Sequence, residues 1–340
     1  MNFDFSEDQH EIKRTARELL ASRSPLARVR EAAEGKAYDK GLWAELVELG
    51  WPGIAIAEEH GGQGLGAVEL AILCEELGYA MAASPLLSTV MAAEAIGAGG
   101  SAEQRAAWLP GLAAGEITGA LGSASGLVGD AQEAAVIVLV GDDGVARVLA
   151  RDEAEVTAVD SIDPTRRAAR VSAPPAHGEP LGGTDPQAGI DRATIAVAAE
   201  LVGVAQRALE MTLGYVKERK QFDTPIGAYQ AVSHKCAQML KDTEGARSAT
   251  YYAAWAADAG VDGPGVPEAA SLAKAAASDG GREVTAAAIQ AHGGIGFTWE
   301  ADVHWLYKRA QVDAALLGGS GAHRRRLAAL VGARLAAAMV

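Results

Sequence analysis

Two segments near the end of the sequence combine charged or polar side chains with closely spaced glycines. The first, RKQFDTPIG, occupies residues 219–227, and the second, QAHGGIGFTWE, occupies residues 290–300. Arg219 carries a planar guanidinium, which binds phosphate oxygens through two parallel hydrogen bonds. The glycines of the second segment lack a Cβ, so a phosphate can approach their backbone N–H groups closely. These residue types suit a phosphate-containing ligand, but the glycine pair taken alone is equally typical of a helix C-terminal cap.

The other side chains of the two segments suit the remaining parts of such a ligand. Phe222 offers an aromatic surface for a ring system, and Gln221 and Gln290 are uncharged hydrogen-bond donors. His292 either lines the nucleotide or serves only in packing. Taken alone, Arg219 is more typical of a solvated arginine in the last turn of a helix. The candidate cofactor ligands are Arg219, Gln221, Phe222, Gln290, His292, Gly293, Gly294 and Gly296. We expect no metal ion among them.

The elements that must position these segments are mostly helical. Apolar residues recur every three to four positions from Ile195 to Val216, which predicts one buried helix face. Residues 134–150, AAVIVLVGDDGVARVLA, predict a β-hairpin, and residues 166–173 predict a further strand. Further helices are expected over residues 41–49, 230–259, 267–292 and 322–338. We expect a mainly α fold with a small β domain, divided into an N-terminal helical domain (1–118), a shortened β domain (119–183) and a C-terminal helical bundle (184–340).

The two glycine-containing segments, about 70 residues apart and in this order, resemble the C-terminal flavin-binding signatures of the acyl-CoA dehydrogenases. In that family, one subunit's Arg-x-Gln-Phe segment and a neighbour's Gln-x-x-Gly-Gly-x-Gly segment jointly hold the pyrophosphate and ADP portion of FAD. The stretches WPGIAIAEEHGGQGLG, CEELGYAMAASPLL and IDPTRRAARV are also similar in type and order. The resemblance therefore covers nearly the whole chain. It implies FAD-dependent α,β-dehydrogenation of an acyl-CoA, with an electron-transfer flavoprotein as acceptor.

The catalytic carboxylate of that family is absent from both of its customary positions. The reaction removes a proton α to a thioester while a hydride leaves Cβ, and it needs a carboxylate in a dry pocket. The resemblance places that glutamate at Gly319 or, in a second group of members, at Ala193. Glu200 lies two helical turns after Ala193 on the same face. It is therefore either a relocated base or a structural ion-pair partner of Arg207.

Short family members with this Gly-Gly sequence resemble the subunits of actinobacterial α2β2 acyl-CoA dehydrogenases that degrade steroids, in which two unlike chains complete one FAD site. Three hypotheses follow for this chain. It is a working dehydrogenase that uses Glu200, a cofactor-supporting subunit of a heterotetramer, or a degenerate member kept for assembly or acyl-CoA binding. The missing acid favours a second acyl-CoA dehydrogenase-like subunit, with a homo-oligomer as the alternative. The resemblance implies that the acyl group of the substrate is a steroid or a branched chain.

Composition and charge exclude several other classes. A net charge of −14 disfavours nucleic acid as a partner, because phosphate backbones require a basic surface. No apolar stretch reaches the length of about 18 residues that a membrane span requires. The N-terminus lacks the apolar segment of a signal peptide, and Cys74 and Cys236 lie far apart, so we expect a cytoplasmic protein without a disulfide scaffold.

Other charged residues receive simpler interpretations. Asp185 and Asp191 lie at a helix start, where we expect N-terminal caps. The run Arg324–Arg326 is either a solvated basic patch or a contact to a CoA 3′-phosphate. The residues expected at an interface or on a solvated helix face are His304, Tyr307, Lys308 and Arg309.

Overall fold

The computed structural model describes residues 4–35, 37–174, 177–259 and 265–338. The early helices are α1 (Glu7–Arg23), α2 (Leu26–Gly35), α3 (Lys40–Glu48), α4 (Ala67–Ala80), α5 (Leu86–Gly99) and α6 (Ala102–Ala113). The strands that follow are β1 (Gly119–Ser123), β2 (Val128–Gly129), β3 (Val136–Val140), β4 (Ala146–Ala150), β5 (Glu155–Val159), β6 (Ala168–Ser172) and β7 (Glu179–Pro180). The later helices are α7 (Pro186–Glu218), α8 (Gln230–Ala259), α9 (Gly265–His292), α10 (Val303–Ala315) and α11 (Ser320–Ala338).

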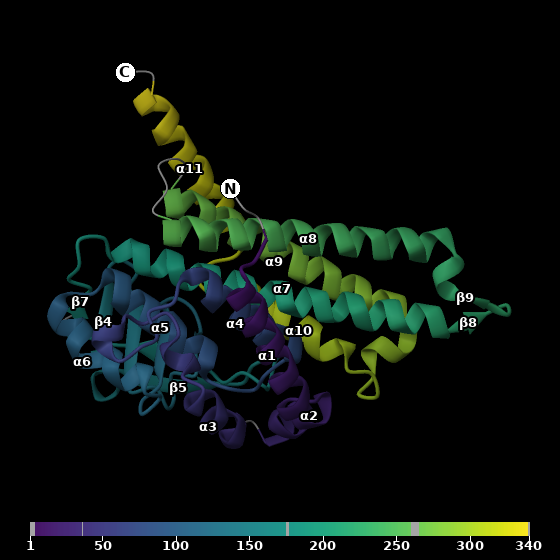
Figure 1. The fold of residues 1–340 in the computed structure, drawn as a ribbon, viewed down its shortest axis with the longest axis horizontal. Coiled ribbons are helices and arrows are strands. Elements are labelled where there is room, and N and C mark those ends of the chain that lie inside the picture. Colours follow the sequence, from purple (N-terminus) through teal and green to yellow (C-terminus); the bar gives the residue numbers. More distant parts are fainter. Residues whose placement is uncertain (1–3, 36, 175–176, 260–264, 339–340) are drawn as a thin grey trace.

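The long helices α7, α8 and α9 pack along one another, and the strands lie near one end of this bundle (Figure 1). The mainly α fold with a small amount of strand is confirmed. No helix in the described ranges is long and apolar enough to cross a membrane. Cys74 and Cys236 are both buried and unpaired.

Strands β1 to β7 form two small sheets. The predicted hairpin is confirmed, because β3 and β4 pair antiparallel with Val138 opposite Val148. β1 pairs parallel to β3, and the sheet order is β1-β3-β4-β7. The second sheet has the order β2-β6-β5. Apolar side chains such as Ile137 and Val171 form a core of their own between these strands.

Helices α4 and α7 cross so closely that glycine is required on both sides of the contact. A Cβ on Gly203 of α7 would lie 1.8 Å from the backbone oxygen of Glu75, and one on Gly78 of α4 would lie 2.1 Å from that of Glu200. Any larger residue at either position would force the two backbones apart. This crossing fixes the depth at which Glu200 sits in the core.

Helix α7 begins as predicted at Asp185, whose carboxylate accepts hydrogen bonds from the backbone N–H groups of Gln187 and Ala188. The expectation of a second cap at Asp191 was wrong. Asp191 lies inside the helix, is fully buried, and receives the guanidinium of Arg326 through Nη2 at 2.8 Å. Arg326 is therefore held in an ion pair and is no part of a solvated patch, because a buried carboxylate needs a cationic partner.

Candidate functional site

The first signature segment forms a small hairpin at the end of the bundle. It follows α7 as β8 (Lys220–Gln221) and β9 (Thr224–Pro225), and Figure 1 shows it projecting beyond the helices. Phe222 and Asp223 form the turn with φ values of +51° and +59°, as a two-residue hairpin turn requires. The Phe222 side chain is 92% exposed. A bulky aromatic residue held in a left-handed conformation with its ring in solvent points to a binding role.

The second segment ends helix α9 in a turn of 3-10 helix, Gly293–Phe297. Gly293 has φ +67°, and a Cβ on Gly293 or Gly294 would meet no atom within 4 Å. Their backbone is therefore open to a ligand. Gly296 is different, because its Cβ would lie 2.7 Å from the backbone oxygen of Ile289. This glycine is needed for packing of the turn against its own helix.

The two segments adjoin within one chain. Tyr215, one helical turn before Arg219, donates a hydrogen bond to the backbone oxygen of His292 at 3.3 Å, and their rings stack at 4.4 Å between centroids. The His292 Nδ1–H donates to the backbone oxygen of Ala288 at 2.7 Å, and burial lowers the pKa of the imidazole. These contacts pack the His292 ring against α7 and α9, and its contact with a nucleotide stays a prediction.

The remaining candidate cofactor ligands are accessible. Arg219, Gln221 and Gln290 are exposed. Among the described residues, the Arg219 guanidinium has no hydrogen-bond or ion-pair partner, while the Gln221 amide donates only to the backbone oxygen of Lys220. An unpaired guanidinium, open glycine N–H groups and an exposed aromatic ring together fit a pyrophosphate joined to aromatic rings.

Glu200 occupies a different environment, the charged centre of the core. Its side chain is 1% exposed, and its Oε1 accepts a hydrogen bond from Arg309 Nη1 at 2.8 Å. Its Oε2 accepts a hydrogen bond from Arg166 Nη2. The expectation that Arg207 is the ion-pair partner of Glu200 was wrong, because the Arg207 guanidinium donates to the Tyr79 hydroxyl at 3.1 Å. The ion pair exists, but the partners come from distant parts of the sequence.

This network joins three elements. Arg309 of α10 also donates to Asp163 Oδ2 at 2.5 Å and to Thr165 Oγ1 at 2.6 Å, in the connection before β6. Arg166 Nε lies 3.1 Å from Asp313 Oδ1. Burial raises the pKa of Asp313 to about 7. Two guanidiniums thus face three carboxylates, which explains why one of the three takes up a proton so readily.

The expectation that residues 304–309 form an interface or solvated face was wrong for two of its members. Arg309 is fully buried and His304 is 7% exposed. The buried face of α10 carries Arg309 beside apolar residues such as Leu306 and Ala310, and a charged side chain in the sequence is more typical of a solvated face. Lys308 is less deeply placed, with its ammonium 4.3 Å from the centre of the Trp299 ring.

Sequence reasoning also missed Lys274 on α9. It is fully buried, and its ammonium donates to the backbone oxygens of Asp313 and Ala314, each at 3.1 Å, and to Ser278 Oγ at 3.0 Å. It therefore closes the C-terminal end of α10, where backbone oxygens lack helical partners. Burial lowers the pKa of Lys274 to about 7. A lone lysine in an alanine-rich helix gave no signal of this role.

Neither customary position of the family carboxylate provides an acid. Ala193 is fully buried in α7, and Gly319 follows α10. A cavity of about 360 Å³ lies between α5, the strands and α10, and Glu200 does not line it. Its lining is mostly apolar and includes Leu87, Met91, Leu121, Val312 and Leu316.

Comparison with known proteins shows which family has this architecture. The acyl-CoA dehydrogenase N-terminal domain matches residues 6–116 and the C-terminal domain matches residues 182–332. The chain is 36% identical to acyl-CoA dehydrogenase IpdE2 of Mycobacterium tuberculosis (strain ATCC 25618 / H37Rv), over 94% of this chain and 96% of that protein. The chain belongs to the acyl-CoA dehydrogenase family.

Solved acyl-CoA dehydrogenase structures agree with this assignment. A chain of the Tcur3481-Tcur3483 steroid ACAD G363A variant superposes with a TM-score of 0.87 at 29% identity, covering 97% of this chain and 99% of that one. A chain of the ChsE4-ChsE5 complex from Mycobacterium tuberculosis gives 0.85 at 25% identity, covering 99% of both. Acyl-CoA dehydrogenases are flavoprotein oxidoreductases, so the predicted enzyme class is confirmed.

Proposed function

We propose that this chain is the cofactor-supporting subunit of a hetero-oligomeric, FAD-dependent acyl-CoA dehydrogenase. One contrast carries the proposal. Both oxygens of Glu200 are engaged by the guanidiniums of Arg166 and Arg309, so neither faces a substrate. The unpaired Arg219 and the open turn at Gly293 instead present a nucleotide-binding surface to solvent. Among the described residues, the signature segments suit a cofactor, whereas Glu200, the acid considered as a base, has both oxygens in ion pairs.

The exposed residues would bind different parts of FAD. Following the family arrangement, Arg219 would bind the pyrophosphate of one FAD through its guanidinium, and the N–H groups of Gly293 and Gly294 would approach phosphate oxygens of an FAD held jointly with a neighbouring subunit. Phe222 would pack against an aromatic ring of the cofactor. Bound FAD supplies the hydride acceptor for dehydrogenation. The buried ion pairs of Arg309 hold the strand region and the bundle in a fixed relation.

Two structures of similar fold support a heteromer, and one of them supports a steroid acyl-CoA as the substrate. One of the structures of similar fold is a complex of two named chains, ChsE4 and ChsE5, and another is a steroid ACAD with two named chains. The base would then come from the partner chain, and an electron-transfer flavoprotein would accept the electrons.

Co-purification from the native organism tests the proposal. The tagged chain should retain a second acyl-CoA dehydrogenase-like chain and flavin absorbance together. Expressed alone, it should be colourless and inactive, and co-expression with the captured partner should restore both properties. Full flavin content and turnover of the chain alone would contradict the proposal.

A further inference from the structure

The cavity of about 360 Å³ between α5, the strands and α10 has one wall that α10 supplies, and we call it the α10 cavity. Gln311 and Ala315 are four positions apart, as are Val312 and Leu316, so all four residues share one face of the helix. The other elements contribute mainly apolar side chains. A cavity of this size, with apolar walls and few polar groups, is typical of a small-molecule site.

Arg166 supplies one hydrogen-bond donor to the α10 cavity. Its side chain lines the cavity although the residue is only 8% exposed. Nη2 donates to Glu200, and Nε lies 3.1 Å from Asp313 Oδ1. The remaining nitrogen, Nη1, donates no hydrogen bond to any described residue and remains accessible. Because buried donors normally have a partner, this nitrogen indicates a ligand oxygen in the cavity.

Gln311 supplies a second donor. Its Oε1 accepts a hydrogen bond from Arg282 Nε of α9 at 3.0 Å. A guanidinium can only donate, so this contact fixes the amide with its oxygen toward α9. The amide nitrogen, Nε2, donates to no residue in the described part of the chain. Its two N–H groups are therefore left for a ligand.

The positive charges of the α10 cavity are already neutralised, so its donors do not indicate an anion. Arg166 faces Glu200, and Arg167, which also lines the cavity, binds both carboxylate oxygens of Glu133. Asp160 adds a further carboxylate to the lining. Free donors without a surplus of positive charge suit a neutral acceptor, such as the oxygen of a ketone or a hydroxyl.

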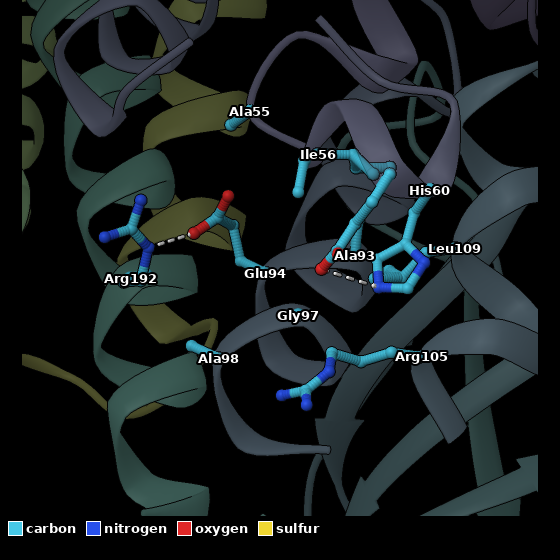
Figure 2. A pocket seen from close by; sticks show the side chains of 12 residues that line it. Ala55, Ile56, His60, Ala93, Glu94, Gly97, Ala98, Arg105, Leu109 and Arg192 are labelled. Atoms are coloured by element: carbon cyan, nitrogen blue, oxygen red, sulfur yellow. Dashed lines mark hydrogen bonds and ion pairs between the residues drawn. The ribbon is translucent and has the colours of Figure 1, made fainter. Parts of the chain in front are cut away.

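A second cavity, of about 430 Å³, differs in both respects. It is bordered by the connection 55–60 and by helices α5, α6 and α7 (Figure 2). Its arginines, Arg105 and Arg192, are matched in number by Glu59 and Glu94, and Arg192 donates to Glu94. Its lining is as polar as it is apolar. The combination of apolar walls with two free donors is therefore a property of the α10 cavity.

We propose that the α10 cavity holds the acyl skeleton of the substrate and that Gln311 selects a skeleton that carries a neutral oxygen, a ketone or a hydroxyl. This oxygen accepts hydrogen bonds from Gln311 Nε2 and Arg166 Nη1, while the carbon skeleton contacts walls such as Leu87 and Met91. A skeleton without the oxygen leaves both donors unpaired, which lowers its affinity. The inference rests on the proposed function, because that function identifies the ligand as an acyl-CoA.

Ligand-observed NMR on the full chain, with 1-indanone and indane as probes, tests the role of Gln311. The two probes share a ring skeleton, and only 1-indanone carries a ketone oxygen. Gln311→Met removes the amide at similar side-chain length, so it should weaken 1-indanone binding about threefold to tenfold and leave indane binding unchanged. Gln238→Met, at an exposed position of α8, is the matched control and should alter neither. Equal 1-indanone affinity of the wild type and Gln311→Met would overturn the proposal.

A second variant tests the location of the probe. Ala315→Phe, one helical turn from Gln311, should fill the cavity and weaken both probes, whereas Ala333→Phe, at an exposed position of α11, should weaken neither. Arg166 also borders an adjoining hollow of about 450 Å³, but Gln311 and Ala315 do not, so their variants report on the α10 cavity. Probe binding unchanged by Ala315→Phe, or no binding of 1-indanone to the wild type at about 10 mM, would contradict the assignment.

The flavin content of the assembled enzyme separates this inference from the proposed function. Gln311 lies outside the two signature segments, so Gln311→Met should retain as much FAD as the wild type. Loss of the probe effect with normal flavin content would overturn the selection of an oxygen and leave the cofactor-supporting role intact. Failure of that role would instead appear in the co-purification experiment, which does not depend on the probes.

Discussion

Glu200 and Arg309 meet in the core, with Oε1 of the glutamate 2.8 Å from Nη1 of the arginine, although 109 positions separate them in the sequence. Both side chains are almost completely inaccessible to solvent. The pair joins α7 to α10, and Arg309 extends the contact to Asp163 before β6. An acid so enclosed holds the fold together, and it has no oxygen left for a substrate proton.

Removal of the arginine from this pair should destabilise the protein strongly. Arg309→Met leaves Glu200 and Asp163 buried without their shared cation, which is expected to lower the free energy of unfolding by about 3–5 kcal/mol. Urea denaturation of the variant measures this loss. Arg325→Met, on an exposed face, serves as the control and should change stability by less than about 0.5 kcal/mol. A loss below about 1 kcal/mol for Arg309→Met would be inconsistent with a structural network.

The pKa of Asp313 predicts a pH dependence of stability. Burial raises the pKa of this carboxyl to about 7 in the folded state, above its value of about 4 in an unfolded chain. Between these values the folded state binds the extra proton. The contribution of Asp313 is therefore fully present below about pH 4 and is lost as pH rises toward 7, by at most roughly 1.4 kcal/mol per pH unit.

Asp313→Asn removes this titration. Denaturation midpoints should fall more steeply from pH 4 to pH 7 in the wild type than in the variant. The other carboxyls titrate in both proteins, so the difference between the two curves reports Asp313 alone. Asp142→Asn, at an exposed turn position, should follow the wild type. Parallel curves for the wild type and Asp313→Asn would refute the assigned direction.

The two kinds of glycine in the α9 turn should respond differently to substitution. Gly294→Ala meets no neighbour, so stability should hold while flavin retention by the assembled enzyme falls. Gly296→Ala brings a Cβ to 2.7 Å from the Ile289 backbone oxygen, so the melting temperature itself should fall. Thermal melts and flavin content, measured on both variants, separate the two roles. Unchanged flavin content in Gly294→Ala would argue against cofactor contact there.

Arg219 should contribute to cofactor affinity and little to stability. Arg219→Gln removes an exposed guanidinium that has no partner among the described residues, so the melting temperature should not move. Loss of a charge-assisted contact to phosphate should weaken FAD binding by the assembled enzyme about tenfold or more. FAD titration followed by fluorescence quenching measures this affinity. Equal FAD affinity of the wild type and Arg219→Gln would remove Arg219 from the proposed cofactor surface.

The sequence predicted helices well wherever apolar residues follow a helical period. The helix expected over residues 230–259 coincides with α8, and the hairpin over 134–150 coincides with β3 and β4. The burial of α10 was not predicted, because its buried face carries Arg309 and Asp313, and charged side chains are more typical of a solvated face.

The candidate site also has one part that the sequence predicts and another part that it does not. Local segments such as the Arg219 hairpin and the Gly293 turn are recognisable because their chemistry is contained within a few residues. The partners of Glu200 are not, since Arg207 is the cation nearest along its helix, whereas Arg166 and Arg309 reach it only through tertiary packing. A single sequence contains no signal for such a contact.

The central claim, that this chain supports the flavin while another chain supplies the base, is tested most directly by flavin bleaching. The assembled enzyme is mixed anaerobically with a steroid acyl-CoA that it oxidises, and the wild type is compared with Glu200→Gln at equal flavin content. We predict the same bleaching rate in both, and no bleaching when this chain alone is supplied with FAD. A decrease of about 100-fold or more in Glu200→Gln, or bleaching by the chain alone, would contradict the account.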